Sequence, residues 1–129
     1  MKKITEDWLQ SAESDLILIQ RIIDQDTLTH QVAFHAQQAI EKCFKAIIEE
    51  YDLGFIKTHS LETLSSLVKK RIDLPLTVDM LILLDQLYLD ARYPGEMGLL
   101  PNGRPSLPES REFAELAEAI HSKTKEILQ

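Results

Sequence analysis

The sequence predicts an all-α protein, an up-and-down antiparallel bundle of four long helices plus one short helix, folded as a single domain over residues 1–129. Three observations predict this class. Apolar residues recur every three or four positions along most of the chain. No segment alternates apolar and polar residues over a useful length, as a half-buried strand would. The breaks between periodic segments carry proline, glycine or short polar runs.

The first two predicted helices cover about residues 5–24 and 30–52, with a short polar break between them. Thr5 is in position to cap the first helix, and Gly54 stands where a C-terminal glycine cap of the second belongs. The apolar stripe of the first helix consists of Trp8, Ala12, Leu16, Ile19 and Ile23. The second helix has a similar apolar side, so both helices are expected to face one core.

Three further helices follow. Ser60 is in position to cap a short third helix, whose basic end suits the negative end of a helix dipole. The fourth covers about residues 78–92 and is stopped by Pro94. After a long loop, Ser106 and Glu109 form a capping box that opens a fifth helix, which runs to the C-terminus.

Composition limits the classes of function. The net charge of −7 argues against a protein that coats nucleic acid through bulk electrostatics. Cys43 is the only cysteine, so no intrachain disulfide forms, and it lies on the apolar side of its helix as a packed thiol. The N-terminus lacks an apolar signal segment, and no apolar run is long enough to span a bilayer. We therefore expect a soluble cytoplasmic protein that does not associate with membranes.

The fourth helix is apolar on more sides than a lone protomer would bury. At about 100° per residue, Ile82 and Leu89 point roughly opposite to Leu84. Phe34 on the second helix and Ile17 on the first show the same excess. Scattered surface hydrophobes are one explanation. The other, which we favour, is an isologous homodimer seam formed by Ile17, Phe34, Ile82 and Leu89.

Asp15 falls within the apolar sector of the first helix, where a carboxylate needs a partner or gives up its charge. Arg92 is a candidate partner, because a guanidinium can hold a carboxylate with two parallel hydrogen bonds. The ion pair Asp15–Arg92 would latch the first helix to the end of the fourth. Alternatively, Arg92 and the adjacent Tyr93 receive a phosphate or a base. Residue types alone favour the latch.

One side of the second helix carries the polar residues His35, Gln38, Lys42, Lys45 and Glu49. Such a stripe can bind an anion such as a nucleotide phosphate, although it is more often simply a solvated face. On the fifth helix, Glu118 and His121 have the spacing found in di-iron bundles, but the sequence has no second copy of it. We therefore expect no metal site and no cofactor.

His59 precedes the cap of the third helix in the stretch KTHSL. It can cap that helix, or it can point into a cleft as an acid or base. The structural role is the more common one.

Four pieces of the chain, taken in order, resemble the HEPN domain family (higher eukaryotes and prokaryotes nucleotide-binding). They are the amphipathic first helix with Trp8 and Asp15-Leu16, then QQAIEKCFKAII at 37–48, THSLETL at 58–64 and ARYPG at 91–95. Each piece is weak alone, whereas the four in order are fairly specific. The resemblance implies a helical bundle that commonly dimerises. It also implies frequent pairing with a small nucleotidyltransferase in toxin–antitoxin-like pairs.

Many members of the family are RNases whose signature is an arginine followed four to six residues later by a histidine. No arginine in this sequence has a histidine at that spacing. The separations from Arg21 to His30 and from Arg111 to His121 are both longer than the signature allows. The chain is more similar to the branch that carries an RYP motif, where nucleotide or partner binding is proposed.

By position, the resemblance implies ligand-binding roles for Lys42, His59, Arg92 and Tyr93. The leading hypothesis is therefore a non-catalytic homodimeric HEPN protein that binds a nucleotide, a small nucleotidyltransferase partner, or both. The alternative is a metal-independent RNase acting on RNA through a non-standard pair, His59 and Arg92. A third reading is a purely structural helical adaptor in which the RYP loop is only a latch.

Overall fold

The computed structural model describes residues 1–74, 77–92 and 104–129, with only the helical backbone described at 91 and 92. The helices are α1 (Lys3–Ile22), the 3-10 turn η1 (Asp26–Leu28), α2 (Thr29–Glu50), α3 (Leu61–Val68), α4 (Val78–Arg92) and α5 (Leu107–Leu128). These described residues contain no strand, which confirms the predicted all-α class. The predicted bounds of α1, α2 and α4 lie within two residues of the observed ones, whereas α3 ends at Val68, before the basic residues 69–71 that were predicted to end it.

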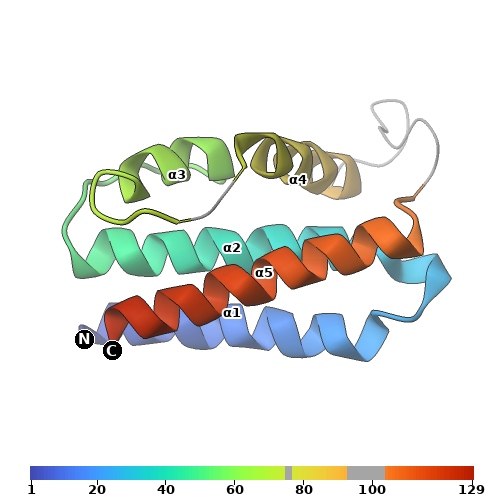
Figure 1. Cartoon of the computed structure of the whole chain (residues 1–129), viewed down its shortest axis with the longest axis horizontal. Helices are drawn as coiled ribbons and strands as arrows, with labels where there is room; N and C mark the ends of the chain where they lie inside the picture. The colour runs from blue at the N-terminus through green and yellow to red at the C-terminus, as the bar shows by residue number, and fades with distance from the viewer. Residues whose placement is uncertain (75–76, 93–103) are drawn as a thin grey trace.

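The helix α2 is the centre of the bundle. It packs against α1, α3, α4 and α5 (Figure 1). In the same view α3 and α4 lie on one side of α2 and α5, and α1 lies on the other. Because α2 is surrounded, its apolar residues are buried on several sides, including Ala36, Ile40, Phe44 and Ile47 at 0% exposure. Burial of these side chains is the main term that holds the helices together.

Two predicted helix starts are confirmed. The Ser60 hydroxyl accepts a hydrogen bond from the Thr63 backbone N–H at 3.2 Å and caps α3. At α5, the Ser106 hydroxyl accepts from the Glu109 N–H at 3.2 Å, while the Glu109 carboxylate accepts from the Ser106 N–H at 3.0 Å. This reciprocal pair is the predicted capping box, and it fixes where α5 leaves the preceding loop.

Two predicted caps are wrong. Thr5 does not cap α1, which begins earlier at Lys3; its hydroxyl instead donates to the Glu50 carboxylate at 2.9 Å and ties α1 to the end of α2. The left-handed residue that ends α2 is Asp52, with φ of 51°, not Gly54. The Leu53 N–H reaches back to the carbonyl of residue 48 at 3.0 Å, which makes this end a Schellman motif.

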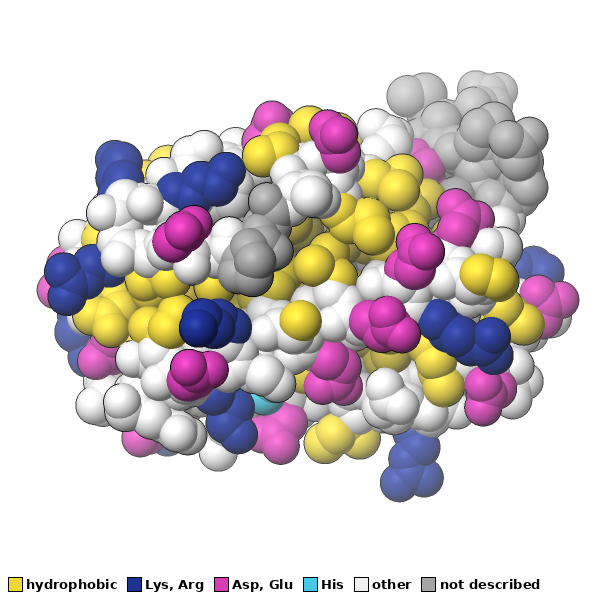
Figure 2. Space-filling view, in the orientation of Figure 1, with side chains coloured by type: hydrophobic (Ala, Val, Ile, Leu, Met, Phe, Trp, Pro, Cys, Tyr) yellow, Lys and Arg dark blue, Asp and Glu magenta, His cyan; other side chains and the backbone are white. Residues whose placement is uncertain are grey.

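The predicted seam residues differ in their surroundings. Ile82 and Leu89 on α4 are each 45% exposed, and hydrophobic side chains gather over α4 with acidic ones at their border (Figure 2). Phe34 is half-buried because its ring stacks on Tyr88 of α4, with 5.2 Å between ring centroids.

Ile17 lies apart from this group, although it is 56% exposed. It is two positions beyond Asp15, so it points about 200° away around α1. Asp15 itself faces His35, the neighbour of Phe34. Phe34, Ile82 and Leu89 therefore belong to the α2–α4 side of the molecule, and Ile17 does not.

Candidate functional site

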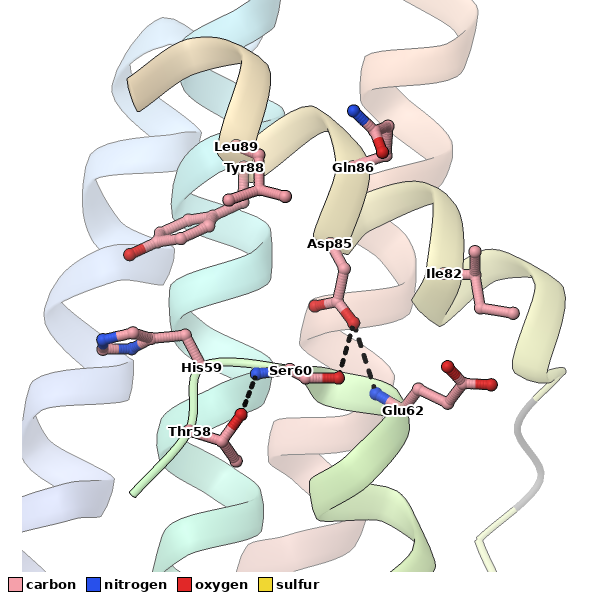
Figure 3. A pocket seen from close by; sticks show the side chains of 9 residues that line it. All are labelled: Thr58, His59, Ser60, Glu62, Ile82, Asp85, Gln86, Tyr88 and Leu89. Carbon is pink, nitrogen blue, oxygen red and sulfur yellow. Dashed lines mark hydrogen bonds between the residues drawn. The ribbon is translucent and has the colours of Figure 1, made fainter. Parts of the chain in front are cut away.

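A pocket of about 540 Å³ lies between the start of α3 and the outer face of α4 (Figure 3). Of the residues that the sequence singled out, it contains His59 and two seam residues, Ile82 and Leu89. The other residues that line it are Thr58, Ser60, Glu62, Asp85, Gln86 and Tyr88. Predicted ligand-site and seam residues thus meet at one place.

Asp85 anchors the pocket floor. One carboxylate oxygen accepts the Leu61 backbone N–H at 2.9 Å and the Gln37 side-chain amide at 3.4 Å. The other oxygen accepts the Ser60 hydroxyl and the Glu62 backbone N–H, both at 3.3 Å. A carboxylate on α4 therefore satisfies the first turn of α3, where the helix dipole favours negative charge.

Sequence reasoning missed Asp85, although one signal pointed to it. Asp85 is a lone carboxylate inside the apolar run MLILL-D-QLYL of the fourth helix, a position that calls for a partner. The capping residue Ser60 was predicted, but its backbone neighbours need further acceptors that a single hydroxyl cannot supply.

His59 does not cap α3, because the capping residue is Ser60; the hydrogen bonds of His59 are instead to α2. Its Nδ1 lies 3.1 Å from an oxygen of Glu41, a carboxylate buried in α2. Glu41 also accepts a hydrogen bond from the Lys45 ammonium at 2.9 Å. The His59 carbonyl accepts from the Gln37 amide at 2.8 Å, so both ends of the residue are tied to α2. With Nδ1 donating to Glu41, Nε2 is left as a proton acceptor on the rim of the pocket.

Aromatic rings connect α2, α4 and the loop before α3. The Tyr88 ring stacks on Phe34 with an interplanar angle of 13° and lies 5.9 Å from the His59 ring. The Phe34 ring meets His35 edge-on. Of these rings, those of His59 and Tyr88 line the pocket, and aromatic walls of this kind suit an aromatic ligand.

Asp15 is buried and has two polar partners on α2, a lysine and a histidine. The Lys42 ammonium lies 2.7 Å from one of its oxygens, and His35 Nδ1 lies 2.9 Å from the other. Asp15 was expected to need a partner, and it has two. Both His35 and Lys42 belong to the polar stripe of α2, which was predicted from the sequence separately from Asp15. The Arg92 side chain and Tyr93 lie outside the described residues, so the predicted Asp15–Arg92 pair stays a prediction.

The polar stripe of α2 is a set of contacts within the protein. Lys42 pairs with Asp15, whereas Lys45 pairs with Glu41 and lies over the Trp8 ring at 5.2 Å. Both ammonium groups are largely shielded and face α1 or their own helix, so the structure does not bring Lys42 to the pocket that holds His59. The stripe fastens α1 to α2.

Two groups of potential chemical interest are enclosed. Burial raises the pKa of the Cys43 thiol to about 12, which keeps it protonated and unreactive. Burial also lowers the pKa of His121. Within the described residues, no group of three or more His, Cys, Asp or Glu side chains is arranged to hold a metal ion. None of the described helices is long and apolar enough to cross a membrane.

In its described residues, the protein is therefore a bundle of five α-helices with a pocket beside α4 that aromatic rings line. The family model of the HEPN domain matches residues 5–128, so the chain belongs to the HEPN domain family. The fold also resembles that of TT1696 from Thermus thermophilus, with a TM-score of 0.77 and 23% identity over 97% of this chain and 98% of that one. No curated protein matches the chain. The family supports a nucleotide-related function in general.

Proposed function

We propose that this chain is a non-catalytic HEPN module that dimerises and binds a nucleotide, a small nucleotidyltransferase partner, or both, within a toxin–antitoxin-like pair. The observation that carries the proposal is the pocket between α3 and α4, with a volume in the range typical of small-molecule sites. It combines apolar walls, two aromatic rings and fixed polar groups, as such sites usually do.

The register of α4 supports the same site. Along α4, Leu89 follows Asp85 by four residues and Arg92 follows Leu89 by three. Asp85 and Leu89 line the pocket. An arginine one helical turn beyond the pocket is suited to phosphate, because a guanidinium binds phosphate oxygens with paired hydrogen bonds. Arg92 and Tyr93 are therefore proposed to contact the phosphates of a nucleotide whose remaining part enters the pocket.

The binding proposal is tested by calorimetry with ATP and other nucleotides, together with a pulldown of any small nucleotidyltransferase encoded by the neighbouring reading frame. We expect nucleotide binding, and we expect Arg92→Ala to weaken it about tenfold or more while leaving the thermal midpoint unchanged. Arg111→Ala is the matched control, since Arg111 pairs with Asp24 away from the pocket.

Two results would count against this reading. No partner together with no binding at millimolar nucleotide would remove it. A large loss of stability in Arg92→Ala with unchanged nucleotide affinity would support the alternative in which the RYP loop is only a latch.

Dimerisation is proposed through the exposed apolar residues of α4. Ile82 and Leu89 also line the pocket, so the proposed nucleotide site borders the proposed seam and shares these two side chains with it. We expect sedimentation velocity to show a dimer, and Ile82→Asp with Leu89→Asp to shift it to monomer, because each added charge would have to be desolvated in the seam. Ile17→Asp is the control, since Ile17 is equally apolar and more exposed but lies apart from Phe34, Ile82 and Leu89. A dimer that survives both α4 substitutions and dissociates on Ile17→Asp would place the seam elsewhere.

A metal-independent RNase is the second candidate, because His59 is exposed on the pocket rim with Glu41 holding its Nδ1. A carboxylate behind a histidine orients the ring and favours proton transfer at Nε2. RNA cleavage by the purified chain that is lost in both His59→Gln and Arg92→Ala would replace the non-catalytic proposal with this one.

A further inference from the structure

The charge of the pocket indicates which end of a nucleotide it receives, an inference that rests on the proposed nucleotide binding. Among the described residues that line the pocket there is no lysine or arginine, whereas Asp85 and Glu62 are carboxylates. The carboxylate of Glu41 lies directly behind His59. A phosphate inside the pocket would meet like charges with no described cation to offset them.

The cations of α2 do not change this balance. Lys45 is linked to the pocket residue His59 through Glu41, and the Glu41 carboxylate holds the Lys45 ammonium at 2.9 Å. Lys42 is held by Asp15 at 2.7 Å on the α1 side of the helix. Moving either lysine to a ligand would deprive a buried carboxylate of its ammonium partner.

The two carboxylates of the pocket differ in availability. Both oxygens of Asp85 already accept hydrogen bonds from the first turn of α3 and from Gln37. The Glu62 carboxylate has no hydrogen-bond or ion-pair partner within the described part of the chain. Figure 3 shows it extending from the first turn of α3 toward Ile82, across the pocket from Tyr88. Glu62 is exposed, so its carboxylate is open to a ligand, and because an ionised carboxylate only accepts hydrogen bonds, a ligand held beside it would offer N–H or O–H donors.

The remaining walls suit a flat ring. Ile82 and Leu89 present apolar surface, and in Figure 3 the Tyr88 and His59 rings lie on the side away from Ile82, with Leu89 next to Tyr88. We propose that the pocket takes the nucleobase and excludes the phosphates, and that Glu62 selects a base edge with two adjacent N–H donors, as guanine presents. Two parallel N–H donors match the two oxygens of one carboxylate, and the base packs against the apolar and aromatic walls.

The test is calorimetry of the full chain with guanosine, inosine and inorganic phosphate. Guanosine is expected to bind about tenfold more tightly than inosine, which lacks the exocyclic amino group, since a hydrogen bond to a charged group contributes that much. Excess inorganic phosphate is not expected to displace guanosine. Glu62→Gln replaces one acceptor oxygen with a donor, so it should remove the preference for guanosine. Glu115→Gln on α5, outside this pocket, is the matched control.

The outcomes separate this inference from the function on which it rests. Displacement of guanosine by inorganic phosphate, or an intact preference in Glu62→Gln, would overturn the assignment of the pocket while nucleotide binding by the chain still stood. Binding of neither nucleosides nor nucleotides would remove the proposed nucleotide binding and this inference together. An unchanged thermal midpoint in Glu62→Gln shows that any loss of affinity is not a loss of folding.

Discussion

Replacing Asp15 with alanine is expected to lower the free energy of unfolding by about 3 kcal/mol, because it leaves the largely buried Lys42 ammonium and His35 ring without their carboxylate partner. The Asp15 side chain is 10% exposed, and those of His35 and Lys42 are 21% and 18% exposed. The Asp15–Lys42 ion pair is therefore only partly screened by water. The loss also removes the main polar tie between α1 and the middle of α2.

Urea denaturation followed by circular dichroism measures this effect, with Asp24→Ala as the matched control. Asp24 is 81% exposed and pairs with Arg111 at 3.3 Å, so its removal is expected to change stability by less than about 1 kcal/mol. A double-mutant cycle between Asp15→Ala and Lys42→Met should return a coupling energy above about 1 kcal/mol. Equal losses in Asp15→Ala and Asp24→Ala would contradict the assigned pairing.

The helices were predictable because their signals are local. Apolar periodicity, the Ser60 cap and the Ser106–Glu109 box each involve residues within one or two turns, and all are observed. The Thr5 cap failed because a tertiary contact outweighed local preference, since the Thr5 hydroxyl donates to Glu50. The Gly54 cap failed because α2 ends earlier than expected, and Asp52 takes the left-handed position that glycine usually fills.

The pairings across the bundle were harder to predict, because they depend on how helices are placed side by side. The sequence indicated that Asp15 needs a cation, and residue types favoured the distant Arg92. The antiparallel hairpin of α1 and α2 offers a nearer answer: its turn near residues 23–28 sets position 15 opposite the middle of α2, where His35 and Lys42 lie. Asp85 was missed for a similar reason, since its partners are backbone groups of another helix.

Replacing Asp85 with alanine is expected to destabilise the protein by about 2 kcal/mol and to loosen the start of α3. The carboxylate accepts backbone N–H groups of Leu61 and Glu62 as well as the amide of Gln37, a residue with 0% exposure. A hydrogen bond to a charged group contributes about 1.5–3 kcal/mol. Because one carboxylate accepts all of these bonds, their contributions do not add up. Without the carboxylate, the first turn of α3 would have only the Ser60 hydroxyl as a side-chain acceptor.

Hydrogen exchange separates this local effect from general destabilisation. In Asp85→Ala the amides of Leu61 and Glu62 are expected to exchange faster, by more than those in the middle of α2, because they lose their acceptor directly. The control is Asp79→Ala. Asp79 lies in the first turn of α4, the helix that carries Asp85, but it is exposed and does not line the pocket. Asp85→Asn should fall between the two, because its amide keeps one acceptor oxygen but turns a donor toward the N–H groups. If Asp85→Ala accelerated exchange equally throughout α2 and α3, Asp85 would stabilise the whole bundle and not the pocket floor.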